Sequence, residues 1–142
     1  MTSRISLDQA NQIIVAAFAR GKELKLKPLS VVVVDAGGHV QAFQRQDGAS
    51  SMRLGIALGK AAGALALGVS SRKIGEMAAE RPAFVTAIAG IPPHGLVPAA
   101  GGIIVKGDDG FAIGAVGVTG DTSDNDEICT LAGIAAAGLT AA

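Results

Sequence analysis

Lys60 is the first residue of this chain whose type and position could support chemistry. It lies four residues after Ile56 and three before Gly63, so at helical spacing it falls within an apolar stripe. A lysine at such a place either extends its amine to a hydrated edge or is enclosed, and enclosure lowers its pKa. The spacing therefore leaves open both a structural lysine and a lysine that faces a ligand.

The two histidines, His39 and His94, are the only imidazoles that could bind haem iron or transfer protons. His39 directly follows the turn glycines Gly37 and Gly38, where a hydrated side chain is the usual outcome. His94 lies in a loop rich in proline and glycine, so we predict that it is the better candidate. No cysteine or carboxylate stands at the spacing of a zinc ligand set, and no dedicated metal site is predicted.

Three further positions could contact an anionic ligand. Gly101-Gly102 precedes a predicted strand, where a backbone without side chains could present N–H groups to an anion. The alternative is that the two glycines only form the bend between the loop and the strand. Arg45 could pair with a substrate carboxylate or a haem propionate, or be a solvated charge. Asp126 lies in the first turn of a predicted helix, a position that already suits a carboxylate because of the helix dipole.

The composition excludes several classes of protein. The chain of 142 residues is predicted to form one domain over residues 1–142. Its 12 basic and 12 acidic residues form no basic stripe, so nucleic-acid binding is not predicted. The single Cys129 excludes an internal disulfide, and the first twelve residues lack the apolar core of a signal peptide, so we expect a cytoplasmic protein.

The apolar residues indicate self-association without a membrane. The uncharged run from Ala83 to Val105 contains three prolines, which argues against a membrane helix. Aromatic residues make up only 3% of the chain, whereas apolar residues make up 49%. Helices built from small apolar residues approach one another closely, so we expect a homo-oligomer. The helix carrying Ile128, Leu131 and Ile134, or the one carrying Met52 and Ile56, is expected to form the interface.

Local signals predict the order α-β-β-α-α-β-β-α. Because the two hairpins are tight, the sheet is expected to be antiparallel with helices against it. The first half of the chain is predicted to contain a helix opened by the Ser6–Gln9 capping box, strands over 29–34 and 40–45, and a helix capped by Ser50/Ser51 and ending near Gly68. The second half is predicted to contain a helix capped by Ser70 and Ser71 and broken or restarted at Pro82, a loop over 91–100, strands over 102–105 and 111–118, and a last helix capped by Thr122 or Ser123.

Four blocks in this order resemble the HbpS/GlcG family, also called DUF336, which includes the C-terminal domain of PduO-type proteins. The blocks are LSVVVVDAGGHVQAFQRQDGAS from Leu29, KAA from Lys60, GGIIVKGDDGFAIGAVGVTGD from Gly101 and TSDNDEICTLAG from Thr122. The resemblance implies a profilin-like or PAS-like α/β sandwich with helices on both faces of the sheet. Lys60 and Asp126 match family positions, whereas GGIIV lacks the proline of the family's GG-x-P-I block.

The resemblance also implies a protein that binds a small molecule or cofactor, with haem or a corrinoid as the ligand. We expect the cleft where Lys60, Gly101-Gly102 and Asp126 converge, since an inward lysine, exposed backbone and a helix N-terminus suit an anion. If haem binds, His94 is the predicted iron ligand. The alternative is an isomerase or lyase of an oxo or hydroxy acid, with Lys60 or His94 as acid/base and Arg45 as carboxylate clamp.

Overall fold

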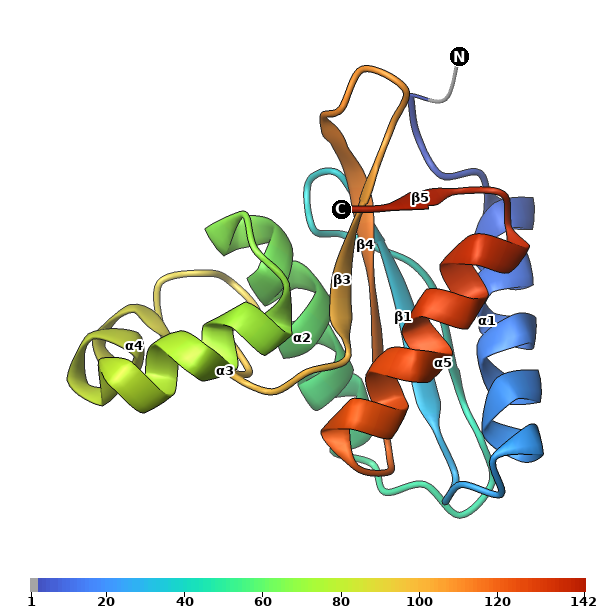
Figure 1. Ribbon diagram of the computed structural model, residues 1–142, viewed down its shortest axis with the longest axis horizontal. Coiled ribbons are helices and arrows are strands. Elements are labelled where there is room, and N and C mark those ends of the chain that lie inside the picture. The colour runs from blue at the N-terminus through green and yellow to red at the C-terminus, as the bar shows by residue number, and fades with distance from the viewer. Residues whose placement is uncertain (1–2) are drawn as a thin grey trace.

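A five-stranded antiparallel sheet in the order β2-β1-β4-β3-β5 forms the centre of the fold (Figure 1). The structure is a computed structural model and describes residues 3–142. The strands are β1 (Ser30–Asp35), β2 (Val40–Arg45), β3 (Gly102–Lys106), β4 (Ala112–Thr119) and β5 (Thr140–Ala141). The helices are α1 (Leu7–Glu23), α2 (Arg53–Leu67), α3 (Ser71–Glu80), α4 (Pro82–Ile88) and α5 (Ser123–Ala136).

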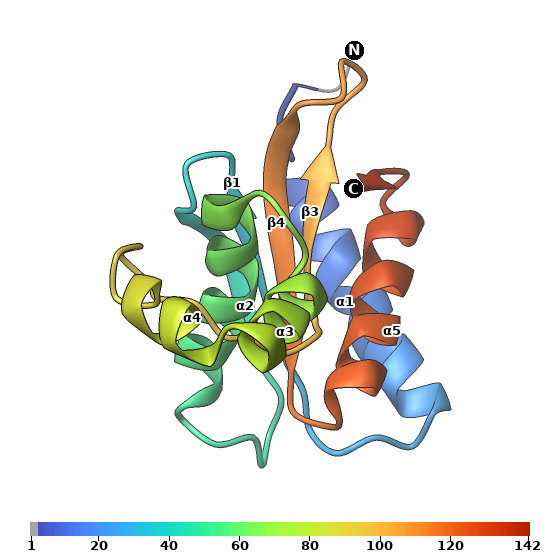
Figure 2. The same ribbon diagram turned by 60° about the vertical axis from the view of Figure 1, so that its left-hand side comes forward.

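Helices cover both faces of this sheet, as predicted. Helices α1 and α5 lie side by side on one face, α2 packs on the other, and α3 and α4 project away from the sheet (Figures 1 and 2). Alternate residues of β1 divide between the two layers: Val31 and Val33 pack toward α1 and α5, whereas Val32 and Val34 pack toward α2. This two-sided burial explains the unbroken run of valines.

The helix boundaries follow local capping chemistry at most of the predicted positions. The Ser6 side chain accepts the N–H of Gln9 and the Gln9 side chain accepts the N–H of Ser6, which completes the predicted capping box. The side chains of Ser70 and Thr122 cap α3 and α5, each by accepting the backbone N–H three residues further on. Pro82 opens α4, because its fixed φ suits a first helical turn and its missing N–H needs no partner there.

Two local predictions differ from the structure. Helix α2 begins at Arg53 behind Met52, which makes no side-chain cap, so Ser50 and Ser51 do not cap it. The sequence analysis also missed β5, a short strand that pairs with β3 at the edge of the sheet. Its two residues carry no alternating pattern of their own, so only the pairing partner identifies them as a strand.

No single helix among the described residues is both long enough and apolar enough to cross a membrane. Helices α2 and α3 pass the same test only as a pair, and they are bent by 80° relative to each other.

Candidate functional site

The middle of α2, which carries Lys60, is buried on all sides. The helix packs against the sheet on one side and against the segment before β3 on the other. Gly59 and Gly63 allow this second contact, because a side chain at either position would meet Val97 or Leu96. The periodicity of the sequence left open whether Lys60 reaches a hydrated edge or is enclosed, and the structure shows that it is enclosed.

The ammonium group of Lys60 is held by two oxygen acceptors. Its Nζ donates to the Val118 carbonyl oxygen at 3.0 Å and lies 3.1 Å from Asp126 Oδ2. The two side chains of this ion pair are only 3% and 1% exposed. Burial lowers the pKa of Lys60, and the charge and hydrogen bond of Asp126 oppose that shift.

Asp126 also links the ion pair to the start of α5. Its Oδ1 accepts the N–H of Asp121 at 2.9 Å, while its Oδ2 accepts from Lys60. One turn further along α5, the Thr130 hydroxyl donates to the Gly101 carbonyl oxygen at 2.7 Å. Helices α2 and α5 lie on opposite faces of the sheet, so these bonds join the two layers past the ends of β3 and β4.

Gly101 and Gly102 allow close packing at this junction. Gly101 has φ +131°, and a Cβ there would lie 2.9 Å from Lys60 Nζ. A Cβ on Gly102 would collide with the backbone carbonyl of Lys60. The Gly102 N–H donates to the buried Ser71 hydroxyl at 2.7 Å. That N–H is therefore engaged within the protein and is not directed at a ligand.

The structure brings four of the predicted site residues together and separates the other two from them. Lys60, Gly101, Gly102 and Asp126 form one buried junction. None of the four lines the cavity of the two histidines, the apolar cavity beside it or the cavity of Arg45. The predicted convergence is thus observed as a filled ion-pair junction rather than as an open cleft, and a ligand-binding role for these residues remains a prediction.

His94 lines a cavity of about 220 Å³ on the other side of α2. His39 lines the same cavity from the turn between β1 and β2, and Ala62 and Leu65 contribute from α2. The His39 side chain is 81% exposed, and its Nδ1 lies 3.4 Å from Asp35 Oδ1. The sequence analysis treated the two histidines separately, since nothing in the linear spacing indicates that the hairpin turn and the 91–96 loop meet.

An apolar cavity of about 340 Å³ adjoins the histidine cavity. The two cavities have Ala66, Pro92 and Pro93 in common, so they lie next to each other, and we call the pair the histidine groove. The remaining residues of its apolar part are Leu67, Phe84, Ile88, Ile91 and Leu96. The groove therefore has an apolar wall made by α2, α4 and the loop before β3, and two imidazoles at one end.

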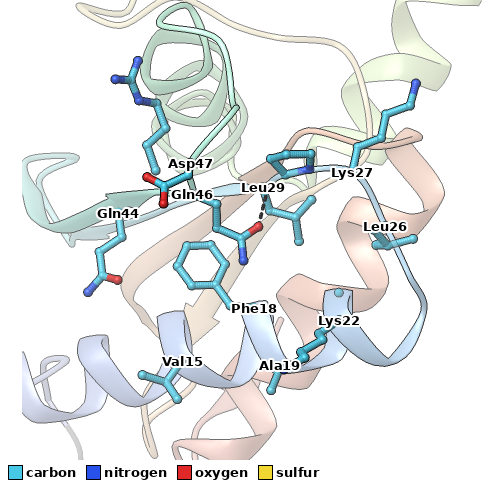
Figure 3. Close-up of a pocket in the computed structure, with 13 residues that line it drawn as sticks. Val15, Phe18, Ala19, Lys22, Leu26, Lys27, Leu29, Gln44, Gln46 and Asp47 are labelled. Atoms are coloured by element: carbon cyan, nitrogen blue, oxygen red, sulfur yellow. Dashed lines mark hydrogen bonds between the residues drawn. The ribbon is translucent and has the colours of Figure 1, made fainter.

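Arg45 lies elsewhere, at the end of β2. It lines a larger cavity between α1 and β2, which contains neither histidine (Figure 3). Within residues 3–142, no group of three or more His, Cys, Asp or Glu side chains is placed to hold a metal ion. Arg45 and His94 therefore do not share one site within a single chain.

The family model described as "Haem degrading protein HbpS-like" matches residues 5–135. The chain belongs to the HbpS-like family. The match agrees with the resemblance seen in the sequence and spans strands β1 to β4, both helical layers and the histidine groove.

Solved structures of HbpS-like proteins share the same architecture. The crystal structure of a PduOC–haem complex matches with a TM-score of 0.85 and 24% identity, over 96% of this chain and 97% of that one. The Klebsiella pneumoniae protein ORFY, assigned to DUF336, matches with a TM-score of 0.84 and 25% identity, over 97% and 93%. HbpS matches with a TM-score of 0.80 and 26% identity, over 95% and 88%. No curated protein sequence matches the chain significantly.

Proposed function

We propose that this HbpS-like chain binds haem in the histidine groove. The observation that carries the proposal is the meeting of His39 and His94 at one end of an apolar groove. A porphyrin needs apolar walls for its ring and an axial donor for its iron, and the groove supplies both. Family membership and the likeness to PduOC, a protein solved in complex with haem, support this choice of ligand.

The residues of the groove fit the group. Its apolar part, about 340 Å³, falls within the range of roughly 300–1,000 Å³ that is usual for small-molecule sites. Imidazole nitrogen is the commonest protein ligand of haem iron. Neither histidine is buried, so both can reach a bound ligand. Bound haem would supply a redox-active iron, whose potential the protein sets through its axial ligand and the polarity around it.

We assign the axial role to His94. It directly follows Pro92 and Pro93, which line both cavities of the groove. The imidazole of His94 is therefore attached next to the apolar wall that a porphyrin would contact. His39 lies across the cavity on a tight hairpin, with Asp35 beside its Nδ1. His39 is therefore expected to contribute to the polar end of the groove without being the main ligand.

Replacing His94 with Ala is expected to abolish or strongly shift the Soret band that develops when haemin is titrated into the purified protein. His39→Ala is the matched control, because it removes the same group from the same cavity, and its spectrum should stay close to that of the unaltered protein. Absorbance spectra across the Soret and visible bands, recorded at increasing haemin concentration, measure the affinity for haem and show which ligand the iron has.

Three outcomes of this titration would contradict the assignment. A normal spectrum in the His94 variant would remove His94 as the ligand. A loss confined to the His39 variant would transfer the axial role across the cavity. Unaltered spectra in both variants and in the double variant would show that haem does not bind at the groove.

No contact described above favours the other two functions considered from the sequence, an isomerase or lyase and a corrinoid-binding protein. An isomerase or lyase that uses Lys60 needs the Lys60 ammonium group at a substrate, whereas that group is enclosed and bound to Asp126 and Val118. The other acid/base candidate, His94, lies in a different cavity from the predicted carboxylate clamp Arg45. The relatives described above include a haem complex but name no corrinoid. The proposal is therefore restricted to haem, in a protein that we place in the cytoplasm because its single cysteine is typical of a reducing compartment.

We further propose that the chain self-associates through the outer face of α5. Ile128 and Leu131 lie one turn apart on that face and are 40% and 42% exposed, whereas Ile134 is buried in the core and cannot take part. Sedimentation velocity at micromolar concentration should show a dimer or larger species, and Leu131→Asp should convert it to monomer. A stable monomer for the unaltered chain would contradict self-association.

A further inference from the structure

The larger cavity, which we call the α1–β2 pocket, has a volume of about 780 Å³ and lies outside the histidine groove (Figure 3). Its walls are the second half of α1, residues 26–29 and residues 44–47. The pocket forms because β2 is the edge strand of the sheet, while α1 packs mainly against α5. Its volume is within the usual range for small-molecule sites.

The amide of Gln46 is held in a fixed orientation in this pocket. Its Oε1 accepts the Leu29 N–H at 2.7 Å, so the oxygen must face the backbone and Nε2 must face away from it. Figure 3 shows this amide beside the Phe18 ring, with its nitrogen on the side of α1. No hydrogen bond within the described residues occupies Nε2. The pocket therefore contains an oriented N–H donor without a protein acceptor.

The surface next to this donor is apolar. Phe18 packs against the main core and turns part of its ring toward the pocket, with Val15 and Ala19 beside it on α1. Leu26 adds an apolar side chain from the segment that leads to β1. A ligand that accepts from Gln46 would therefore lay an apolar body along α1.

The charges around the pocket favour an anion. Lys22 lies one turn after Phe18 on the face of α1 that lines the pocket, and within residues 3–142 it makes no ion pair shorter than 4 Å. The other lining cations lie further from Gln46: Figure 3 shows the amine of Lys27 turned away from it, and Arg45 follows Phe43 onto the α2 side of β2. An unpaired cation at the rim of a cleft raises the local concentration of anions.

We propose that the α1–β2 pocket binds an organic monoanion with an apolar body, of the class of a medium-chain carboxylate. One carboxylate oxygen accepts from Gln46 Nε2, the Lys22 ammonium group neutralises its charge, and the alkyl chain covers Phe18 and Val15. The donor, the apolar strip and the Lys22 ammonium group each select a different part of such a molecule. This second site does not depend on haem binding.

The decisive variant is Gln46→Glu. It keeps an oxygen that accepts the Leu29 N–H but replaces the donor with a negative charge, so the fold is retained while the anion is repelled. Calorimetric titration with decanoate should show binding to the unaltered protein, weakened about tenfold or more in the variant, which corresponds to about 1.4 kcal/mol or more. Gln12→Glu is the matched control, because it makes the same change on an exposed residue of α1 outside the pocket.

Decan-1-ol and haemin complete the experiment. The alcohol has the same chain without the charge, so its weaker binding should be the same for Gln46→Glu and for the unaltered protein. Saturating decanoate should leave the haemin titration unchanged, which separates the two sites. Equal decanoate affinity in the Gln46 and Gln12 variants, or no decanoate binding to the unaltered protein, would overturn the proposal. Displacement of haemin by decanoate would show that the two ligands compete for one site.

Discussion

Asp126→Ala is expected to lower the free energy of unfolding by about 3–5 kcal/mol, because it leaves the buried Lys60 ammonium without a counter-charge. Only the Val118 carbonyl would remain as its acceptor, and the Asp121 N–H would lose its partner as well. Whole domains are stable by only about 5–15 kcal/mol, so a loss of this size is readily measured by urea unfolding at pH 7. Asp124→Ala, in the same turn of α5 but 78% exposed, should cost about 1 kcal/mol or less.

The pH dependence of the Asp126→Ala variant tests this explanation further. Burial lowers the pKa of Lys60, and Asp126→Ala removes the charge and the side-chain hydrogen bond that oppose that shift. The folded state then binds fewer protons than the unfolded state at pH values between the lowered pKa and the unfolded value of about 10.4. Stability must therefore rise with pH across that window. The deficit of the variant should shrink toward high pH.

The double variant Lys60→Met, Asp126→Leu distinguishes an ion pair from general loss of packing. It removes both charges and fills similar space with apolar atoms, so much of the lost stability should return. A double variant as unstable as Asp126→Ala would show that the other contacts of Asp126 account for the effect. A negligible effect of Asp126→Ala alone would contradict the buried ion pair itself.

Gly102→Ala is expected to cost about 3 kcal/mol, at the upper end of the range for overpacked sites. The added Cβ would collide with the backbone carbonyl of Lys60 and lie 2.9 Å from Ser71 Oγ. A backbone group in the middle of a buried helix cannot rotate away as a side-chain tip can, so α2 must shift from the sheet. Urea unfolding gives the change in free energy, and haemin titration shows whether the shift reaches the histidine groove.

Gly55→Ala is the matched control for this prediction. Gly55 lies on α2 itself, yet a Cβ there would meet no atom within 4 Å. Alanine has a higher helix propensity than glycine, so this change should stabilise the protein by about 0.5–1 kcal/mol. If both alanine variants destabilised the protein equally, close approach of α2 to β3 would not be the reason that glycine is needed at position 102.

The sequence by itself determined the order of the elements and most of their ends. Ser6, Ser70, Thr122 and Pro82 act within one helical turn of their own position, so local pattern is sufficient to place them. The valine run of β1 likewise indicated a strand covered on both faces, whereas the apolar spacing around Lys60 left open whether that lysine is enclosed. The order of the motifs was sufficient to identify the family, which the family model confirms.

Only the tertiary structure decided what the converging residues do and which residues share a cavity. Lys60, Gly101 and Asp126 meet as predicted. Whether a cleft remains between them depends on how closely α2 approaches the sheet and the start of β3. Here the approach is set by contacts such as Gly102 against the Lys60 backbone, between residues far apart in the chain. The meeting of His39 with His94 has the same origin. The hairpin turn and the loop become neighbours only because α2 packs on the sheet and the loop packs on α2. These contacts join residues far apart in the chain, so no local sequence pattern indicates them.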